Sequence, residues 1–162
     1  MASVIILDKT KKEKFIEKIS IGIEKIPYLL IKIGGERIRA YSGSFSKEEL
    51  YRIFSLLPVE ACGLYFAKEF DDDARLSLDA LHAVKDEIIK NGKNIIEVSE
   101  KQEKDWFYGK AIELDEEQQK KYQDAEGFVA VKSGEDFIGT GKIFADKKSI
   151  ANFLPKERRV KS

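Results

Sequence analysis

The residue types that most often carry chemistry are scarce in this 162-residue chain, which has one cysteine, Cys62, and one histidine, His82. A zinc site built from nitrogen and sulfur ligands is therefore excluded. A Cys–His dyad assembled by the fold stays open as an alternative, but a small core cysteine and a surface or partly buried histidine are simpler interpretations. We predict no catalytic residue and no cofactor, so the chain is not expected to be an enzyme.

Two short motifs resemble ligand-binding loops. The run Asp71-Asp72-Asp73 lacks the alternating ligands and distant glutamate of a calcium loop, and we interpret it as a solvated turn. Gly139-Thr140-Gly141 has neither Rossmann spacing nor a Gly-Lys-Ser/Thr ending, so it is not a phosphate loop. Its place inside a strand pattern indicates a β-bulge or a close backbone approach, which could itself serve a ligand. No metal site is predicted.

The clearest functional signal is a basic cluster near the end of the chain. Residues 147–162 contain six basic residues and one acidic residue, a net charge of +5, whereas residues 100–126 contain nine acidic and five basic residues. The cluster consists of Lys156, Arg158, Arg159 and Lys161. Planar guanidinium donors bind phosphate oxygens, so the cluster predicts an anionic polymer such as RNA as the partner. A solvated tail is the alternative.

Composition limits the class of protein. The chain as a whole is neutral, with 29 basic and 29 acidic residues, which argues against a histone-like protein. A hydrophobic fraction of 43% is enough for a core. A single cysteine excludes an intramolecular disulfide and favours a reducing compartment, so we expect a cytoplasmic protein, or a nuclear or nucleolar one in a eukaryote. No apolar run is long enough to span a membrane, and no membrane partner is expected.

Residues 1–91 predict an α/β domain with a mainly antiparallel sheet and helices. Apolar spacing predicts helices over residues 9–24, 46–57 and 79–89. The second helix starts with the capping box Ser46/Glu49. Its expected buried stripe is Leu50, Ile53, Phe54 and Leu57. Alternation predicts strands over residues 28–33, 37–41, 60–70 and 75–78. Asn91-Gly92 is a helix C-cap and the expected domain boundary.

Residues 92–162 predict a small β-barrel sealed at one end by a helix, so the fold class is α+β. The expected strands are residues 94–98, 110–114, 128–132 and 137–144. Ser99 starts the helix, and Gly109 stands where a left-handed C-cap is needed. Residues 115–126 form either a surface loop or a short helix. Without a catalytic candidate, this half of the chain is expected to bind rather than to catalyse.

Three segments, taken in order, resemble the Nip-seven family of ribosome biogenesis factors. They are Cys62–Val84, DWFYGKAI at 105–112, and GFVAVKSGEDFIGTGKI at 127–143. The positions that carry the resemblance are Arg75, Ala80, Leu81, Phe107, Tyr108, Gly109, Gly127, Gly139 and Gly141. It covers roughly Leu29 to Phe144, and the short C-terminus is similar to archaeal members. The second half by itself resembles the PUA domain of pseudouridine synthases and archaeosine transglycosylases.

The resemblance implies an N-terminal α/β domain (residues 1–91), a C-terminal PUA domain (residues 92–162), no catalysis, and RNA binding during rRNA processing and maturation of the large ribosomal subunit. It implies a basic RNA surface on the PUA domain, at Lys142, Lys147, Lys148, Lys156, Arg158, Arg159 and Lys161. The acidic stretch Glu113–Lys121 departs from the PUA pattern by lacking its second glycine, which argues against phosphate contact on that side.

The expected partner is RNA, in particular rRNA in single-stranded or uridine-rich segments. Other ribosome assembly factors are expected to bind through the N-terminal domain. Two alternatives stay open. One is a non-catalytic accessory subunit of an RNA-modifying enzyme, because PUA domains are often attached to such catalysts; an enzyme role would need a polar cluster with shifted pKa values in a cleft of the first domain. The other is a protein–protein adaptor, which would show an exposed apolar patch, rimmed by charge, on the N-terminal domain.

Overall fold

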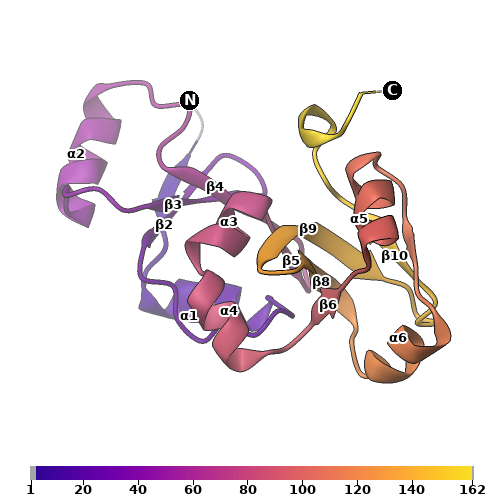
Figure 1. Cartoon of the computed structure of the whole chain (residues 1–162). Helices are drawn as coiled ribbons and strands as arrows, with labels where there is room; N and C mark the ends of the chain where they lie inside the picture. The colour runs from indigo at the N-terminus through magenta and orange to yellow at the C-terminus, as the bar shows by residue number, and fades with distance from the viewer. Residues whose placement is uncertain (1–2, 162) are drawn as a thin grey trace.

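The computed structural model describes residues 3–161 and contains two five-stranded sheets that lie side by side (Figure 1). The first sheet takes its strands from the first half of the chain, and the second takes them from the second half. The predicted α+β class is confirmed at this level. The outermost positions of the two predicted domains, residues 1–2 and 162, lie outside the described residues.

The first sheet is antiparallel throughout, with its strands in sequence order. The strands are β1 (Val4–Ile6), β2 (Leu29–Ile33), β3 (Arg37–Tyr41), β4 (Leu64–Glu69) and β5 (Ala74–Leu76). Alternate residues such as Leu30 and Ile38 point to one face, where they pack with Phe15 of α1. The predicted antiparallel sheet is therefore confirmed, although β4 begins four residues later than expected and leaves Cys62 in the preceding loop.

Four helices accompany this sheet within the described part of the chain: α1 (Lys9–Glu17), α2 (Lys47–Leu56), α3 (Leu78–Ala83) and α4 (Lys85–Asn91). Asp8, Ser46 and Ser77 each cap a helix by accepting a hydrogen bond from a backbone N–H three residues on. The continuous helix predicted over residues 79–89 is wrong, because Val84, at φ −118° and ψ 27°, separates α3 from α4.

Two other helix predictions are corrected. The helix predicted over residues 9–24 ends at Glu17, because Ile19, Ile21 and Ile23 are buried at every second position along an irregular segment, which no helix could do. The stripe predicted for α2 is buried only at Leu50, and Leu57 is 60% exposed. This helix therefore touches the sheet along a narrow line and leaves most of its surface open.

The second sheet curls into a half-barrel with strand order β6-β8-β9-β10-β7. Its strands are β6 (Ile95–Glu97), β7 (Ile112–Glu113), β8 (Gly127–Ser133), β9 (Asp136–Ile143) and β10 (Ser149–Asn152). Strand β6 is parallel to β8, and the other pairs are antiparallel. The stretch between β7 and β8 contains the short helix α6 (Glu116–Lys121).

Trp106 on α5 (Glu100–Phe107) is fully buried in the half-barrel and determines the glycine pattern of β9. A Cβ at Gly139 would lie 2.8 Å from the indole ring, and the indole N–H donates a 2.8 Å hydrogen bond to the carbonyl oxygen of Ile138. The register of β8 and β9 also shifts here. The predicted bulge and close approach are confirmed, and the group that approaches is a core tryptophan.

One apolar cluster spans the two sheets, beside a separate core inside the half-barrel around Trp106. Ala130 and Phe137, on the outer side of the half-barrel, belong to the same buried cluster as Phe66 and Leu81 of the first half. The Ser20 hydroxyl also donates a 2.6 Å hydrogen bond to the Phe128 carbonyl oxygen. The two halves are thus packed against each other rather than joined only by a linker. No helix within residues 3–161 is long and apolar enough to cross a bilayer.

Candidate nucleic-acid interface

Three phenylalanines meet where the first sheet packs against the half-barrel. Phe70 follows β4, Phe128 lies on β8, and Phe153 follows β10. The rings of Phe70 and Phe128 are stacked with centroids 6.0 Å apart, and Phe128 meets Phe153 edge to face at 5.9 Å. Phe128 is buried, but Phe70 and Phe153 are partly exposed. Aromatic surface therefore reaches solvent along the line between the two sheets.

Cations cover this aromatic cluster. The Arg75 guanidinium lies 4.5 Å from the ring centroid of Phe153, and the Lys142 ammonium lies 5.0 Å from that of Phe128. A ring face attracts a cation, so these contacts position the charged groups at the surface. We call these five residues, Phe70, Phe128, Phe153, Arg75 and Lys142, the sheet junction. Asp73 lies 3.8 Å from the Lys142 ammonium and partly balances its charge.

A small pocket of about 170 Å³ opens beside the sheet junction. Its lining includes Tyr65, Arg75, Asp79, Phe153 and Arg158. The Arg158 guanidinium donates a 3.0 Å hydrogen bond to the Asp79 carboxylate, which ties the C-terminal segment to α3. Both side chains are still more than a third exposed, so the pair is accessible to a ligand. Flat rings and charged donors thus surround a space open to solvent.

The C-terminal segment contains a short 3-10 helix, η1 (Lys156–Arg158). Lys156, Arg158 and Lys161 are exposed. Arg159 instead turns inward: its Nε donates a 2.9 Å hydrogen bond to the Leu154 carbonyl oxygen, and its side chain lies against Gly109. Arg159 therefore packs within the protein, whereas Lys156 and Lys161 face solvent and Arg158 is exposed but paired with Asp79.

The remaining predicted RNA contacts lie elsewhere. Lys142 belongs to the sheet junction. Lys147 and Lys148 lie in the turn that precedes β10, at the opposite end of that strand from the C-terminal segment. Lys147 has φ 60° and donates a hydrogen bond to the carbonyl oxygen of Ala125, while Lys148 is exposed. The fold therefore divides the seven predicted residues among three places.

Sequence reasoning did not assign Arg75, Phe70 and Phe153 to the site, although they form its centre. Phe153 is far from the other two along the chain, and packing of the two sheets brings them together. One signal was present in the sequence: Lys68, Phe70 and Arg75 flank the acidic turn Asp71-Asp72-Asp73, so a hairpin there would place two cations and a ring at one end of the sheet. Their neighbours from the half-barrel had no such signal.

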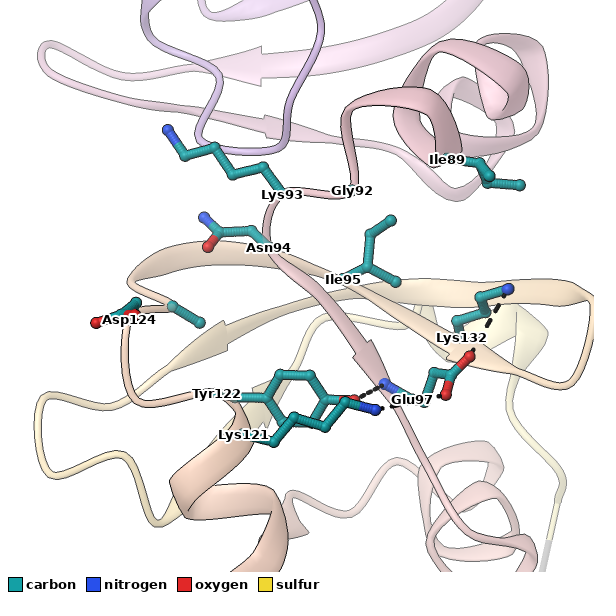
Figure 2. A pocket seen from close by; sticks show the side chains of 11 residues that line it. Ile89, Gly92, Lys93, Asn94, Ile95, Glu97, Lys121, Tyr122, Asp124 and Lys132 are labelled. Atoms are coloured by element: carbon teal, nitrogen blue, oxygen red, sulfur yellow. Dashed lines mark hydrogen bonds and ion pairs between the residues drawn. The ribbon is translucent and has the colours of Figure 1, made fainter.

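A second, larger pocket of about 660 Å³ is lined by the connection between α4 and β6 and by residues around Tyr122 (Figure 2). Figure 2 shows Glu97 between two lysines, and its carboxylate lies 3.9 Å from the ammonium of Lys121 and 3.8 Å from that of Lys132. The Tyr122 hydroxyl accepts a 3.0 Å hydrogen bond from the Glu97 N–H. Glu97 balances two cations of this pocket, whereas Arg75 in the smaller pocket has no carboxylate at ion-pair distance among residues 3–161, so the larger pocket is the weaker candidate for an anionic ligand.

The two residues considered for catalysis do not form an activated site. Burial raises the pKa of the Cys62 thiol, although the charge of Arg39 acts in the opposite direction. A thiolate nucleophile needs a lowered pKa, so this environment disfavours one. His82 is exposed on α3. Among residues 3–161 no group of three or more His, Cys, Asp or Glu side chains is placed to hold a metal ion.

Comparison with protein families gives one match. Residues 93–160 match the family described as the methyltransferase RsmF PUA domain. No curated protein matches the chain. The match confirms the PUA component of the resemblance, whereas the assignment to the Nip-seven family stays a prediction. Residues 93–160 therefore contain a PUA-like domain, a non-catalytic module that typically binds RNA.

Proposed function

We propose that this protein binds RNA at the sheet junction and along the adjoining C-terminal segment. The observation that carries the proposal is the position of Arg75 and Lys142 over aromatic rings at the edge of a PUA-like domain. Lysine and arginine neutralise phosphates, and exposed rings stack with unpaired bases. The exposed Arg158 and Lys156 extend the positive surface from the pocket toward the C-terminus.

The proposed target is rRNA, in single-stranded or uridine-rich segments, and the proposed role is assembly of the large ribosomal subunit. The ordered resemblance of Cys62–Val84 and residues 105–143 to the Nip-seven family supports this choice. The single cysteine supports a reducing compartment, the cytoplasm, for this activity. In this role the protein holds RNA and carries out no reaction.

A second candidate is a non-catalytic accessory subunit of an RNA-modifying enzyme. The supporting observation is that the family matched by residues 93–160 is described as a domain of a methyltransferase. In that role the same surface would present RNA to a separate catalytic subunit. The two candidates share the RNA contacts and differ in the RNA bound and in the partner protein.

Exposed apolar side chains around α2 support a protein partner for the first half of the chain. Leu56 and Leu57, at the C-terminal end of α2, are 75% and 60% exposed, and the exposed Arg52 lies one helical turn before Leu56. Phe45, just before the helix, is 50% exposed. An exposed apolar patch with a charged rim is typical of a protein-binding surface. This patch is where we place contacts with other assembly factors, or with a partner in the adaptor alternative.

Ultraviolet crosslinking in the source cells, followed by sequencing of the bound RNA, tests the proposed function. Footprints concentrated in large-subunit rRNA support the assembly role, and footprints beside methylated nucleotides in several RNAs support the accessory role. A Lys142→Gln/Arg158→Gln variant should crosslink several-fold less. Lys101→Gln/Lys120→Gln removes the same charge from the acidic side and should crosslink like the wild type. Absence of crosslinks with the wild-type protein would overturn RNA binding.

A further inference from the structure

We propose that the RNA-binding surface continues from the sheet junction onto the open face of the first sheet, where it takes single-stranded RNA. This inference rests on the proposed function and adds to it a site outside the PUA-like domain. The residues that carry it are Arg37 on β3, Lys68 on β4 and Arg75 on β5, which we call the cationic row. Arg75 belongs to both the cationic row and the sheet junction.

The sheet register aligns these three cations. Arg37 lies directly opposite Lys68, and Lys68 lies directly opposite Arg75. Residues that are paired across strands point to the same face, so the three side chains form a line perpendicular to the strands. With neighbouring strands about 4.8 Å apart, this line spans about 10 Å. It leads from the middle of the first sheet to the half-barrel.

Stability of the sheet alone does not explain this arrangement, because like charges directly opposite each other destabilise a sheet. Lys68 is paired with Glu36 at 3.1 Å. Within residues 3–161, Arg37, Arg39 and Arg75 have no carboxylate at ion-pair distance. A polymer with regularly spaced negative charges would supply the missing counter-ions.

Aromatic rings alternate with these cations. The Arg37 guanidinium lies 5.5 Å from the Tyr65 ring centroid, and the Lys68 ammonium lies 5.3 Å from that of Phe70. Arg75 then lies between Phe70, at 6.0 Å, and Phe153, at 4.5 Å. Single-stranded RNA is held by such combinations, because its unpaired bases stack on rings and guanidinium planes while cations hold the phosphates.

The face of the first sheet that carries the cationic row is uncovered only at β3, β4 and β5, where these cations lie. Its other half, at β1 and β2, is covered by α2, whose Leu50 packs with Ile6 and Ile31. The opposite face of the sheet carries Ile38 and is closed by Phe15 of α1. The uncovered part of the sheet is therefore the part that adjoins the PUA-like domain, which allows one RNA strand to cross both.

Titration of a fluorescein-labelled 12-nucleotide oligouridine, followed by anisotropy at several salt concentrations, tests this inference on the full chain. An Arg37→Thr/Lys68→Thr variant should bind about tenfold more weakly. Its plot of log affinity against log salt should be shallower by about 1.4, the equivalent of two single-strand phosphate contacts. Threonine is favourable in strands, and removal of opposed charges should leave the melting temperature unchanged or raised. The single variant Arg37→Gln removes one charge and is an independent test, in which the affinity should fall less than in the double variant.

Lys11→Gln/Lys14→Gln is the matched control, because it removes the same charge from exposed positions of α1, behind the sheet. Its affinity should stay within about twofold of the wild type. Equal affinities of the cationic-row variant and this control would overturn the inference. Preference for the same strand annealed to its complement would overturn the single-strand assignment. If the wild type binds RNA and only Lys142→Gln/Arg158→Gln weakens the binding, the proposed function stands and this inference fails. If the wild type does not bind RNA, both the proposed function and this inference fail.

Discussion

The hydroxyl of Thr140 on β9 donates a 2.8 Å hydrogen bond to the carbonyl oxygen of Leu76, the last residue of β5, and both residues are buried. Thr140 is also the only polar residue buried among residues 3–161. This bond links the edge of the first sheet to the half-barrel at the sheet junction. It therefore helps to determine how the cations of the two halves are placed relative to each other.

Replacement of Thr140 by Val should lower the free energy of unfolding by about 1–2 kcal/mol, because the buried carbonyl oxygen loses a donor. Chemical denaturation of the full chain measures this change. Thr140→Ser keeps the hydroxyl and is expected to lose less stability than Thr140→Val. If both variants unfold at the same denaturant concentration, the hydrogen bond does not contribute as argued.

If the predicted domain boundary at Asn91-Gly92 is correct, the fragment Lys93–Ser162 should fold alone. All five strands of the half-barrel lie within residues 95–152, so the fragment should give a dispersed amide spectrum. Its stability should be lower than that of the full chain, because separation exposes Ala130 and Phe137. Collapsed amide peaks would show that the two halves form one folding unit.

The carboxylate of Glu69 predicts acid sensitivity. Burial opposes its ionisation, but a 2.9 Å hydrogen bond from Lys32 and the charge of Lys18 outweigh burial and hold its pKa below the ordinary value. A carboxyl with a lowered folded pKa stabilises the protein fully above the unfolded pKa, about 4.3, and this stabilisation is lost as the pH falls through the folded pKa.

Thermal unfolding at pH 7 and at lower pH values should therefore show wild-type stability falling below about pH 4.3. Glu69→Gln should lower stability at pH 7 and flatten this part of the profile. Glu117→Gln, an exposed position on α6, serves as the control and should retain the wild-type profile. A Glu69→Gln profile parallel to that of the wild type would contradict the assignment.

Gly139 is required by Trp106. Its φ is +152°, which residues with side chains rarely adopt, and an added Cβ would lie 2.8 Å from the indole ring. Gly139→Ala should therefore lower the free energy of unfolding by about 2 kcal/mol or more. The control is Gly35→Ala, because a Cβ there meets nothing within 4 Å. Chemical denaturation measures the change in the free energy of unfolding, and near-UV circular dichroism of the folded variants shows whether the packing around Trp106 has changed.

The two neighbouring arginines of the C-terminal segment should behave differently. Arg158→Ala should weaken RNA binding for all sequences and make the salt dependence shallower by about 0.7, as expected for loss of one phosphate contact. Arg159→Ala should mainly lower stability, since Arg159 donates to Leu154 and packs on Gly109. Oligouridine titrations and thermal melts of both variants separate these effects. Loss of RNA affinity in Arg159→Ala without loss of stability would show that Arg159 contacts RNA.

Local features of the chain were predictable from the sequence because they depend on neighbouring residues. The capping box at Ser46, the helix start at Ser99 and the left-handed Gly109 appear as predicted. Each requires a particular residue type at a fixed offset, so a single sequence contains the whole signal. The basic charge of the C-terminal segment and the scarcity of catalytic side chains were also evident.

The candidate site depends on contacts that a linear pattern does not contain. Packing of the two sheets places Arg75 over Phe153, and the strand register places Arg37 opposite Lys68. The fold of the C-terminal segment also directs Arg159 inward, while the neighbouring Arg158 reaches Asp79. The amino-acid sequence thus determined the elements and the available charges. Only the tertiary structure decided which cations share a surface, because burial and cross-strand pairing join residues that are distant along the chain.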